Sequence, residues 1–397
     1  MSFEIVSIEK CPSYDLEAVK EALDKVLDNI DALDFVKPGM RIGIKANLVS
    51  AMAPEKSATT HPQILKRLCE LLLERGASVI IGDSPGGIYT EGFLKGVYKT
   101  CGLEEMVKEL DNTGERVSLN RDFSIKNGEN KEAVSLKTFI YTGWLDNVDA
   151  IINVSKLKTH AMMGMSCAVK NMFGTIPGTT KPEYHMRFPE EMAFANLMVD
   201  LNEFFKPQLY VVDAIEGMEG NGPTAGETRH IGLVLASKRP YALDLACADL
   251  IGMGLNDVAT LIAAADRGLG PKNLSEVTLV GTKEEEVRIP DFKRATIHQS
   301  ITFEGGGLFN KIESMLLKAT YNTKPMPNKK ECIGCKKCFE TCPAKAITMV
   351  SGGKNGIPKI DRSKCIKCFC CQEFCPVGAM KVHYNVLGRM VNAINHD

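Results

Sequence analysis

The sequence CIGCKKCFETCP at residues 332–343 decides the fold of one end of the chain, because it sets four cysteines at spacings of two, two and three residues before a proline. The sequence CIKCFCCQEFCP at residues 365–376 repeats this pattern 33 residues later. Nine of the 14 cysteines lie in this region, and the other five are scattered singly. Secreted disulfide frameworks are short and spread their cysteines along the chain, so this concentration in a 397-residue chain indicates metal ligation.

The two runs resemble those of the bacterial two-cluster ferredoxins, in which Cys-x2-Cys-x2-Cys-x3-Cys-Pro holds 4Fe–4S clusters. The resemblance covers residues 328–384. In that family the fourth cysteine of each run ligates the other cluster. The resemblance therefore implies one cluster held by Cys332, Cys335, Cys338 and Cys375, and another held by Cys365, Cys368, Cys371 and Cys342.

A zinc site is the alternative for these cysteines. Zinc sites usually combine two Cys-x2-Cys pairs across a longer gap, whereas here two complete four-cysteine runs each end in proline. Cys370 falls outside the pattern, and we expect it to be a packed thiol that ligates no cluster.

The balance of charge changes near residue 324. Residues 325–397 contain 12 Lys and Arg against five Asp and Glu, whereas the rest of the chain has a formal charge of −8. The positive excess offsets the negative charge of two clusters with their thiolates, and a docking patch for an acidic partner is the other interpretation. Prolines and polar residues at 323–330 break any preceding helix. We predict an α/β domain at 1–320, a linker at 321–328, a ferredoxin domain at 329–384 and a tail at 385–397.

Apolar strand-like segments alternate with helices through the larger domain. This alternation predicts an α/β fold with a mostly parallel sheet and helices on both faces, followed by a small ferredoxin-like α+β domain. Residues 112–147 and 282–324 are polar and are expected to be excursions, with a turning or flexible loop at Gly305–Gly307. The expected strands are Phe3–Ile8, Met40–Lys45, Val79–Gly82, Val148–Val154, Leu209–Val212, Ile231–Ala236 and Val277–Val280, and the expected helices are Asp15–Asp34, Pro62–Arg75, Pro189–Phe205, Tyr241–Ile251 and Asp257–Ala265.

Composition excludes several classes of protein. Hydrophobic residues make up 44% and charged residues 24%, which is ordinary for a globular protein. The net charge of −1 gives no basis for nucleic-acid binding. No apolar run approaches the ~18 residues of a membrane span, and the N-terminus begins a strand-like pattern at once where a secretory signal would be apolar. We therefore predict a cytoplasmic protein without a membrane span.

Polar segments follow several of the expected strands. The dinucleotide motif G-x-G-x-x-G and the P-loop motif are both missing from the larger domain. Because parallel strands end at one edge of a sheet, we expect the polar segments to form one crevice for a phosphate or carboxylate, with Lys158 and a neutral, proton-accepting His160 as catalytic residues. Each segment alone is also typical of an ordinary turn or a solvated lysine. The other expected crevice residues are Lys45, Asn47, Gly82, Asp83, Ser84, Lys156, Lys170 and Asn171.

These segments, followed by the two cysteine runs, resemble the domain-of-unknown-function 362 family. The resemblance covers essentially the whole chain and rests on Lys45-Ala46-Asn47, Gly82-Asp83-Ser84, Lys156–His160 and Lys170–Gly174. It implies a shared fold for the larger domain and a fused ferredoxin-type tail, and it adds little chemistry.

Three functions fit this sequence. Two clusters fused to a large domain favour an oxidoreductase that relays electrons to or from a small anionic substrate, or to a flavin or deazaflavin that converts one-electron to two-electron chemistry. A non-enzymatic electron carrier or docking subunit of a larger redox complex is the first alternative. A regulatory or metal-centre assembly protein that uses its clusters as a sensor is the second. A redox partner protein is compatible with each.

Overall fold

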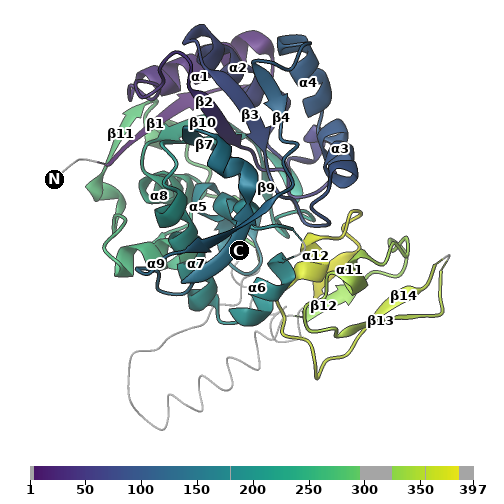
Figure 1. Ribbon diagram of the computed structural model, residues 1–397. Coiled ribbons are helices and arrows are strands. Elements are labelled where there is room, and N and C mark those ends of the chain that lie inside the picture. The colour runs from purple at the N-terminus through teal and green to yellow at the C-terminus, as the bar shows by residue number, and fades with distance from the viewer. Residues whose placement is uncertain (1–3, 179, 296–323, 354, 384–397) are drawn as a thin grey trace.

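The computed structural model describes residues 4–178, 180–295, 324–353 and 355–383. Within these residues a nine-stranded sheet forms the centre of the larger domain, in the order β11-β1-β10-β9-β7-β2-β3-β4 with β8 paired to β7 (Figure 1). Its strands are β1 (Glu4–Lys10), β2 (Arg41–Lys45), β3 (Ser78–Gly82), β4 (Val117–Leu119), β7 (Ala150–His160), β8 (Gly164–Ser166), β9 (Leu209–Glu219), β10 (Glu227–Ser237) and β11 (Val277–Gly281).

Most neighbouring strands of this sheet run parallel. β7 pairs in parallel with β2 and with β9, β2 pairs in parallel with β3, and β3 with β4. β10 runs antiparallel to both of its neighbours, β1 and β9. Ile42, Ile44 and Ile152 of the central strands are fully buried, as expected when both faces of a sheet are covered. The predicted α/β fold with a mostly parallel sheet is confirmed.

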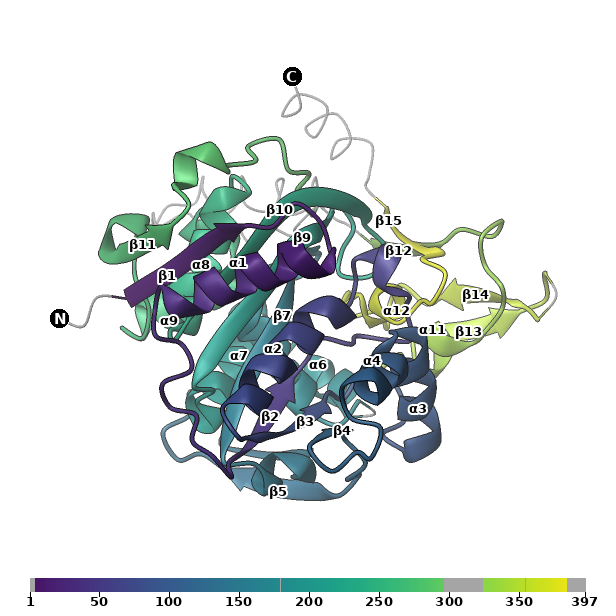
Figure 2. The ribbon, with the colours of Figure 1, turned by 90° about the horizontal axis from the view of Figure 1, so that it is seen from above.

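Helices cover both faces of the sheet (Figure 2). The apolar sides of α1 to α4 form one hydrophobic cluster with Ile44 and Ile81, and those of α5, α7, α8 and α9 form two clusters on the other side. The helices are α1 (Leu16–Asp28), α2 (Pro62–Glu74), α3 (Glu91–Thr100), α4 (Leu103–Leu110), α5 (Ala168–Asn171), α6 (Lys181–Arg187), α7 (Glu191–Phe205), α8 (Pro240–Leu250) and α9 (Ala259–Asp266). Short 3₁₀ turns occupy Pro54–Lys56, Gly143–Asn147, Met172–Thr175, Leu255–Asp257, Leu274–Glu276 and Glu284–Glu286.

Strand β7 is longer than predicted. The sequence suggested that the strand ends at Val154 and that a polar loop follows, but the strand continues to His160. β8 pairs with its last three residues, and every residue of the strand is buried. The polar residues of this segment stay in the sheet because they have partners inside the protein, as described below.

Two further predictions need correction. Residues 112–147, expected to be an excursion, include β4 at the edge of the main sheet and a separate hairpin of β5 (Ile125–Glu129) and β6 (Thr138–Thr142). Part of the expected linker is strand β12 (Lys324–Pro327), which pairs with the last described strand of the chain. Prolines are tolerated at such sheet edges. The expected loop at Gly305–Gly307 lies outside the described residues.

The C-terminal domain consists of two small antiparallel sheets and two short helices. β12 pairs with β15 (Met380–His383), and β13 (Ile347–Val350) pairs with β14 (Ile357–Ile360). The short helices α11 (Lys337–Glu340) and α12 (Cys370–Glu373) each follow the first cysteines of one run. Its small core contains Cys338, Ile347, Cys371 and Met380.

Candidate functional site

Three parallel strands bring most of the expected site residues to one edge of the sheet. Lys45 ends β2, Gly82 ends β3, and the first half of β7 runs between β2 and β9 while its second half continues past the end of β2. Gly82 is required there because a Cβ atom would lie 2.7 Å from the ring of Trp144, which packs under these strands. The sheet therefore gathers the polar residues as the parallel topology predicts.

A buried polar network connects these strand ends. The ammonium of Lys45 lies 2.7 Å from Asp83 Oδ1, and both side chains are almost completely buried. Asn171 Oδ1 accepts a hydrogen bond from Asn47 Nδ2 at 2.9 Å. Lys158 Nζ donates to Asn47 Oδ1 at 2.8 Å. Burial lowers the pKa of Lys45, and the carboxylate of Asp83 opposes that shift.

A small pocket opens beside this network. Its volume is about 30 Å³, which is room for about two water molecules. Four of the expected site residues line it, namely Asn47, Asp83, Lys170 and Asn171. The rest of its wall is formed by Val49, Gly86, Ser166, Phe173, Gly174, Lys181, Pro223 and Phe374.

Two lysines supply positive charge to the pocket. The side chain of Lys170 is largely buried, and no carboxylate forms an ion pair with it in the part of the chain that the structure describes. Its ammonium lies 6.0 Å from the ring centroid of Phe173. Lys181 lies 5.4 Å from the same centroid and donates a hydrogen bond to the carbonyl of Ser84. Ammonium groups in a nearly dry site favour a bound anion.

The two residues predicted to be catalytic do not line the pocket. Lys158 lies behind Asn47 and also donates to the carbonyl of Ala58 at 2.7 Å. His160 Nδ1 accepts hydrogen bonds from the backbone of Met162 and Met163. Neither residue lines the pocket, although Lys158 holds the lining residue Asn47, and the catalytic roles of Lys158 and His160 stay predictions.

His160 is neutral in this environment. Burial, followed by the positive charges of Lys170 and Lys158 and by His185, holds its pKa well below the usual value. Because Nδ1 accepts two hydrogen bonds, the ring proton lies on Nε2, for which the described residues provide no hydrogen-bond partner. The lowered pKa favours the neutral imidazole that the sequence suggested, but Nδ1, the nitrogen that could accept a proton, already accepts backbone hydrogen bonds.

Lys156 faces a different part of the molecule. Its ammonium lies 3.0 Å from Asp213 Oδ2 and 2.5 Å from the hydroxyl of Tyr14. The ring of Tyr14 stacks on His61, with centroids 3.6 Å apart. A register shift between Lys156 and Lys158 turns the two lysines toward different partners.

Sequence reasoning missed Lys181, Ser166 and Phe374. Lys181 begins α6, whose seven residues have no clear helical periodicity in the sequence. Ser84 was expected at the site but serves as a support, since its hydroxyl accepts a hydrogen bond from the backbone of Gly178 at 2.8 Å. A lysine followed by proline after a turn would have been the one signal for the start of α6.

The cysteines surround two separate cavities in the C-terminal domain. Cys332, Cys335, Cys338 and Cys375 line one cavity, and Cys342, Cys365, Cys368 and Cys371 line the other. Each cavity therefore takes three cysteines from one run and the fourth from the other run. Cys370 lies at neither cavity and is fully buried.

The separation of these cysteines suits a cluster better than a single ion. Among the described residues, no three Cys, His, Asp or Glu side chains converge tightly enough to hold one metal ion. A cubane occupies the space between its four thiolates, so its ligands stand further apart than those of zinc. The residues present therefore fit 4Fe–4S clusters, which would supply one-electron chemistry.

The C-terminal domain closes one side of the pocket. Phe374 packs so closely on Gly86 that a Cβ atom there would lie 1.9 Å from its ring. Gln372 donates to the carbonyl of Asn221 at 3.1 Å, and Thr224 donates to the carbonyl of Gln372 at 3.4 Å. Phe374 directly precedes the cluster cysteine Cys375. The pocket and the cysteine cavities are thus neighbours.

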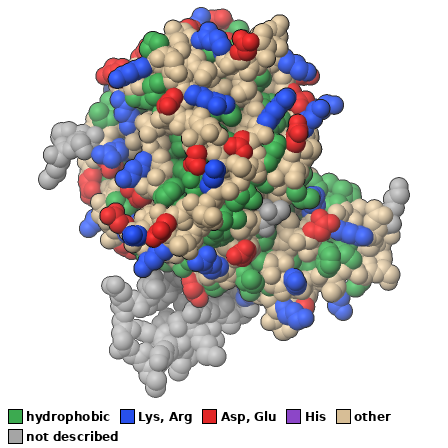
Figure 3. Space-filling model, in the orientation of Figure 1, with side chains coloured by type: hydrophobic (Ala, Val, Ile, Leu, Met, Phe, Trp, Pro, Cys, Tyr) green, Lys and Arg blue, Asp and Glu red, His purple; other side chains and the backbone are tan. Residues whose placement is uncertain are grey.

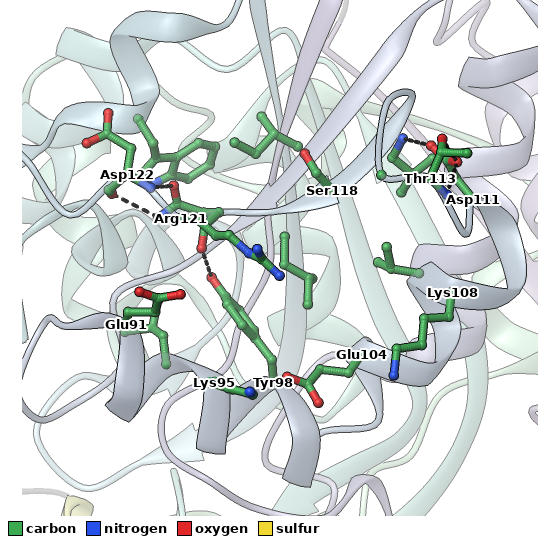
Figure 4. Close-up of a pocket in the computed structure, with 18 of the residues that line it drawn as sticks. Glu91, Lys95, Tyr98, Glu104, Lys108, Asp111, Thr113, Ser118, Arg121 and Asp122 are labelled. Carbon is green, nitrogen blue, oxygen red and sulfur yellow. Dashed lines mark hydrogen bonds between the residues drawn. The ribbon is translucent and has the colours of Figure 1, made fainter.

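A larger groove lies elsewhere in the molecule. It has a volume of about 940 Å³ and runs along β4 between α3 and α4 (Figure 4). Arg121 and Tyr98 extend into it, and neither the cysteines nor the buried lysines line it. Its carboxylates Asp111 and Asp122 accept hydrogen bonds from backbone N–H groups of the surrounding loops. Its size alone does not connect it to redox chemistry.

The fold and the two cysteine cavities define a two-domain iron–sulfur protein. The chain belongs to the family described as domain of unknown function DUF362, which matches residues 42–249. Residues 331–379 match a 4Fe-4S dicluster domain. The family resemblance read from the sequence is therefore confirmed.

Known proteins that are similar to this chain include the following two. The thylakoid-associated protein sll1697 of Synechocystis sp. is 29% identical over 305 residues, covering 75% of this chain and 90% of that protein. The lactate racemase apoprotein of Thermoanaerobacterium thermosaccharolyticum has a TM-score of 0.39 at 12% identity, covering 62% of this chain and 57% of that chain. Within the described residues, no helix is both long and apolar enough to cross a membrane. The cytoplasmic location stays a prediction.

Proposed function

We propose that this chain is an iron–sulfur oxidoreductase in which two clusters exchange electrons with a small anion bound in the pocket of Lys170 and Lys181. The observation that carries the proposal is the shared wall: Phe374 of the dicluster domain closes a pocket of the larger domain that is lined by buried cations. A ligand there would lie beside the cluster held by Cys375. Short distance to a cluster is what one-electron transfer to a substrate requires.

The size and polarity of the pocket suggest the kind of ligand. A volume of about 30 Å³ admits a carboxylate group or a similarly small oxyanion. Lys170 and Lys181 would neutralise its charge, and the amides of Asn47 and Asn171 would orient it. Lys45 and Lys158 act as positioning residues, since each holds one of the lining side chains. A flavin or deazaflavin ring does not fit a pocket of this size, so no step is assigned to one.

One observation favours the second candidate function, a non-enzymatic electron carrier or docking subunit. Of the crevice residues expected from the sequence, Lys45, Lys158 and His160 do not line the pocket, whereas Lys170 does. In a carrier, the buried lysine network would serve the stability of the larger domain and its contact with the dicluster domain.

Ligand binding separates the two functions. The anaerobically purified, cluster-loaded chain is denatured and any released small molecule is identified by mass spectrometry; acetate and inorganic phosphate are titrated in parallel by calorimetry. We expect Lys170→Met to weaken anion binding by about tenfold or more, because a charge-assisted hydrogen bond is lost. Lys37→Met changes an exposed lysine and serves as the control. No bound anion in the wild type, or equal binding in Lys170→Met, would leave the carrier as the better function.

A further inference from the structure

The cysteines of the two cavities differ in how far they are exposed to solvent. Cys335 is exposed, whereas Cys371 of the other cavity is only 7% exposed. The other ligands of both cavities are buried or partly buried. The path through protein from an external electron donor to a cysteine ligand is therefore shortest at Cys335.

The surface around Cys335 has an apolar centre and a basic border. Ile333 and Val377 are 53% and 43% exposed, and both line the cavity to which Cys335 belongs. Lys336 lines the same cavity, and Lys329 and Lys330 precede it in the chain. An apolar centre within a charged rim is the usual composition of a surface that binds another protein. We define the Cys335 face by Lys329, Lys330, Ile333, Cys335, Lys336 and Val377.

The lysines of this face are not neutralised by ion pairs in the described parts of the chain. Lys329, Lys330 and Lys336 are exposed and form no ion pair among the residues that the structure describes, whereas nearby Lys381 pairs with Glu331 at 2.8 Å. Figure 3 shows lysine or arginine side chains interspersed with hydrophobic ones over the dicluster domain. Charge compensation of the clusters explains a general positive excess, but it does not require exposed apolar residues beside the lysines.

We propose that the Cys335 face docks a small acidic protein that carries one electron, and that this carrier reduces the cluster held by Cys332, Cys335, Cys338 and Cys375. One electron leaves the carrier, which is oxidised, and enters the cluster, which is reduced; no atom is transferred. Carboxylates on the carrier complement the lysines and steer it onto the apolar centre. This proposal rests on the electron-relay function proposed above. Its test measures reduction of the clusters and not ligand binding in the pocket, so the two proposals can fail independently.

The test follows reduction of the clusters in the full-length, iron-loaded chain. A reduced acidic flavodoxin is the electron donor, and cluster bleaching is recorded by anaerobic stopped-flow absorbance at several ionic strengths. The variant Lys330→Glu/Lys336→Glu reverses two charges of the face. The control Lys37→Glu/Lys238→Glu reverses two exposed charges of the larger domain. Dithionite, a small inorganic reductant, reports whether the clusters themselves are intact.

We expect the second-order rate constant with flavodoxin to fall at least about tenfold in Lys330→Glu/Lys336→Glu at low salt, and to become less dependent on salt. Reduction by dithionite and the iron content should equal those of the control. Equal flavodoxin rates in both double variants would overturn the proposal. Concentration-dependent dimerisation that Lys330→Glu/Lys336→Glu abolishes would assign the face to a second copy of the chain and would also overturn it. If the double variant loses iron, Lys329→Glu/Lys330→Glu provides the same comparison at exposed residues that do not line the cavity.

Discussion

His160 is buried near the ligand pocket but does not line it. Its Nδ1 atom fixes the turn at Met162 and Met163, and its surroundings keep the ring neutral. The unfolded chain, in contrast, protonates this histidine near its ordinary pKa. Folding and proton uptake at this residue therefore oppose each other.

This opposition predicts a pH dependence of stability. The pKa of His160 is lower in the folded state, so below about pH 6.5 the unfolded state binds more protons and the free energy of unfolding decreases as the pH falls. His160→Asn keeps an acceptor for the two backbone N–H groups without a titrating ring. We expect urea unfolding between pH 7.5 and 5 to show a smaller loss of stability in this variant, by about 1.4 kcal/mol per pH unit at most.

His61 contributes to the residual slope in that experiment, besides Asp244, whose raised pKa of about 7 acts in the opposite direction. Burial lowers the pKa of His61 to about 4, so it contributes in the same direction as His160. The slope should therefore be reduced in His160→Asn and not abolished. An unchanged slope would mean that His160 is charged in the folded protein.

At the scale of elements, a short helix in each cysteine run of the dicluster domain leads from the three cysteines at one cavity to the fourth cysteine, which lies at the other cavity. α11 contains Cys338 and ends two residues before Cys342, the fourth cysteine of that run, which lines the cavity of the other run. We expect Cys342→Ser to damage the cluster of Cys365, Cys368 and Cys371, reducing the iron content from about eight to about four per chain. Iron analysis and electron paramagnetic resonance of the reduced protein measure this loss.

Cys370→Ser is the matched control, because Cys370 is buried but lines neither cavity. It should retain both clusters. Loss of the cluster of Cys332, Cys335 and Cys338 in Cys342→Ser would contradict the crossed arrangement of ligands.

The contact between Phe374, which follows α12, and the loop after β3 requires glycine at position 86. At Gly86 a Cβ atom would overlap Phe374, whereas at Gly96 in α3 it would meet no atom within 4 Å. We expect Gly86→Ala to destabilise the loaded protein by about 1–3 kcal/mol through overpacking, and Gly96→Ala to be neutral or stabilising. Thermal unfolding compares the two. Phe374→Ala in the Gly86→Ala background should restore part of the loss, and equal melting of both glycine variants would argue against close packing here.

Elements with a strong pattern could be predicted from the sequence, and those that depend on tertiary contacts could not. The cysteine runs and the strand ends at Lys45 and Gly82 follow from spacing and from parallel topology. The different environments of Lys156 and Lys158 depend on a register shift, because two residues apart on a regular strand share a face. The place of Phe374 depends on how the two domains pack, which no local pattern encodes.

At the scale of the whole molecule, the larger domain has the apolar core and the dicluster domain has little. The three large hydrophobic clusters contain residues up to Phe292, whereas the hydrophobic cluster of the dicluster domain contains, among the described residues, four buried ones, two of them cysteines. We expect a chain ending before Lys324 to fold and to unfold cooperatively, because it retains these clusters. Circular dichroism and calorimetric melting measure this. An aggregated or non-cooperative product would show that the dicluster domain is required for the fold of the larger one.

Because Phe374 of the dicluster domain forms one wall of the pocket, the pocket is complete only when that domain is folded. We expect a domain with so small an apolar core to need its metal centres in order to fold. Because each cavity takes cysteines from both runs, each cluster would link the two halves of the domain. Without iron, the larger domain would persist with Lys170 and Lys181 uncovered on one side. In a cell short of iron, we therefore expect the larger domain to be folded but unable to enclose its anion. The supply of iron would then set the fraction of the protein that is active.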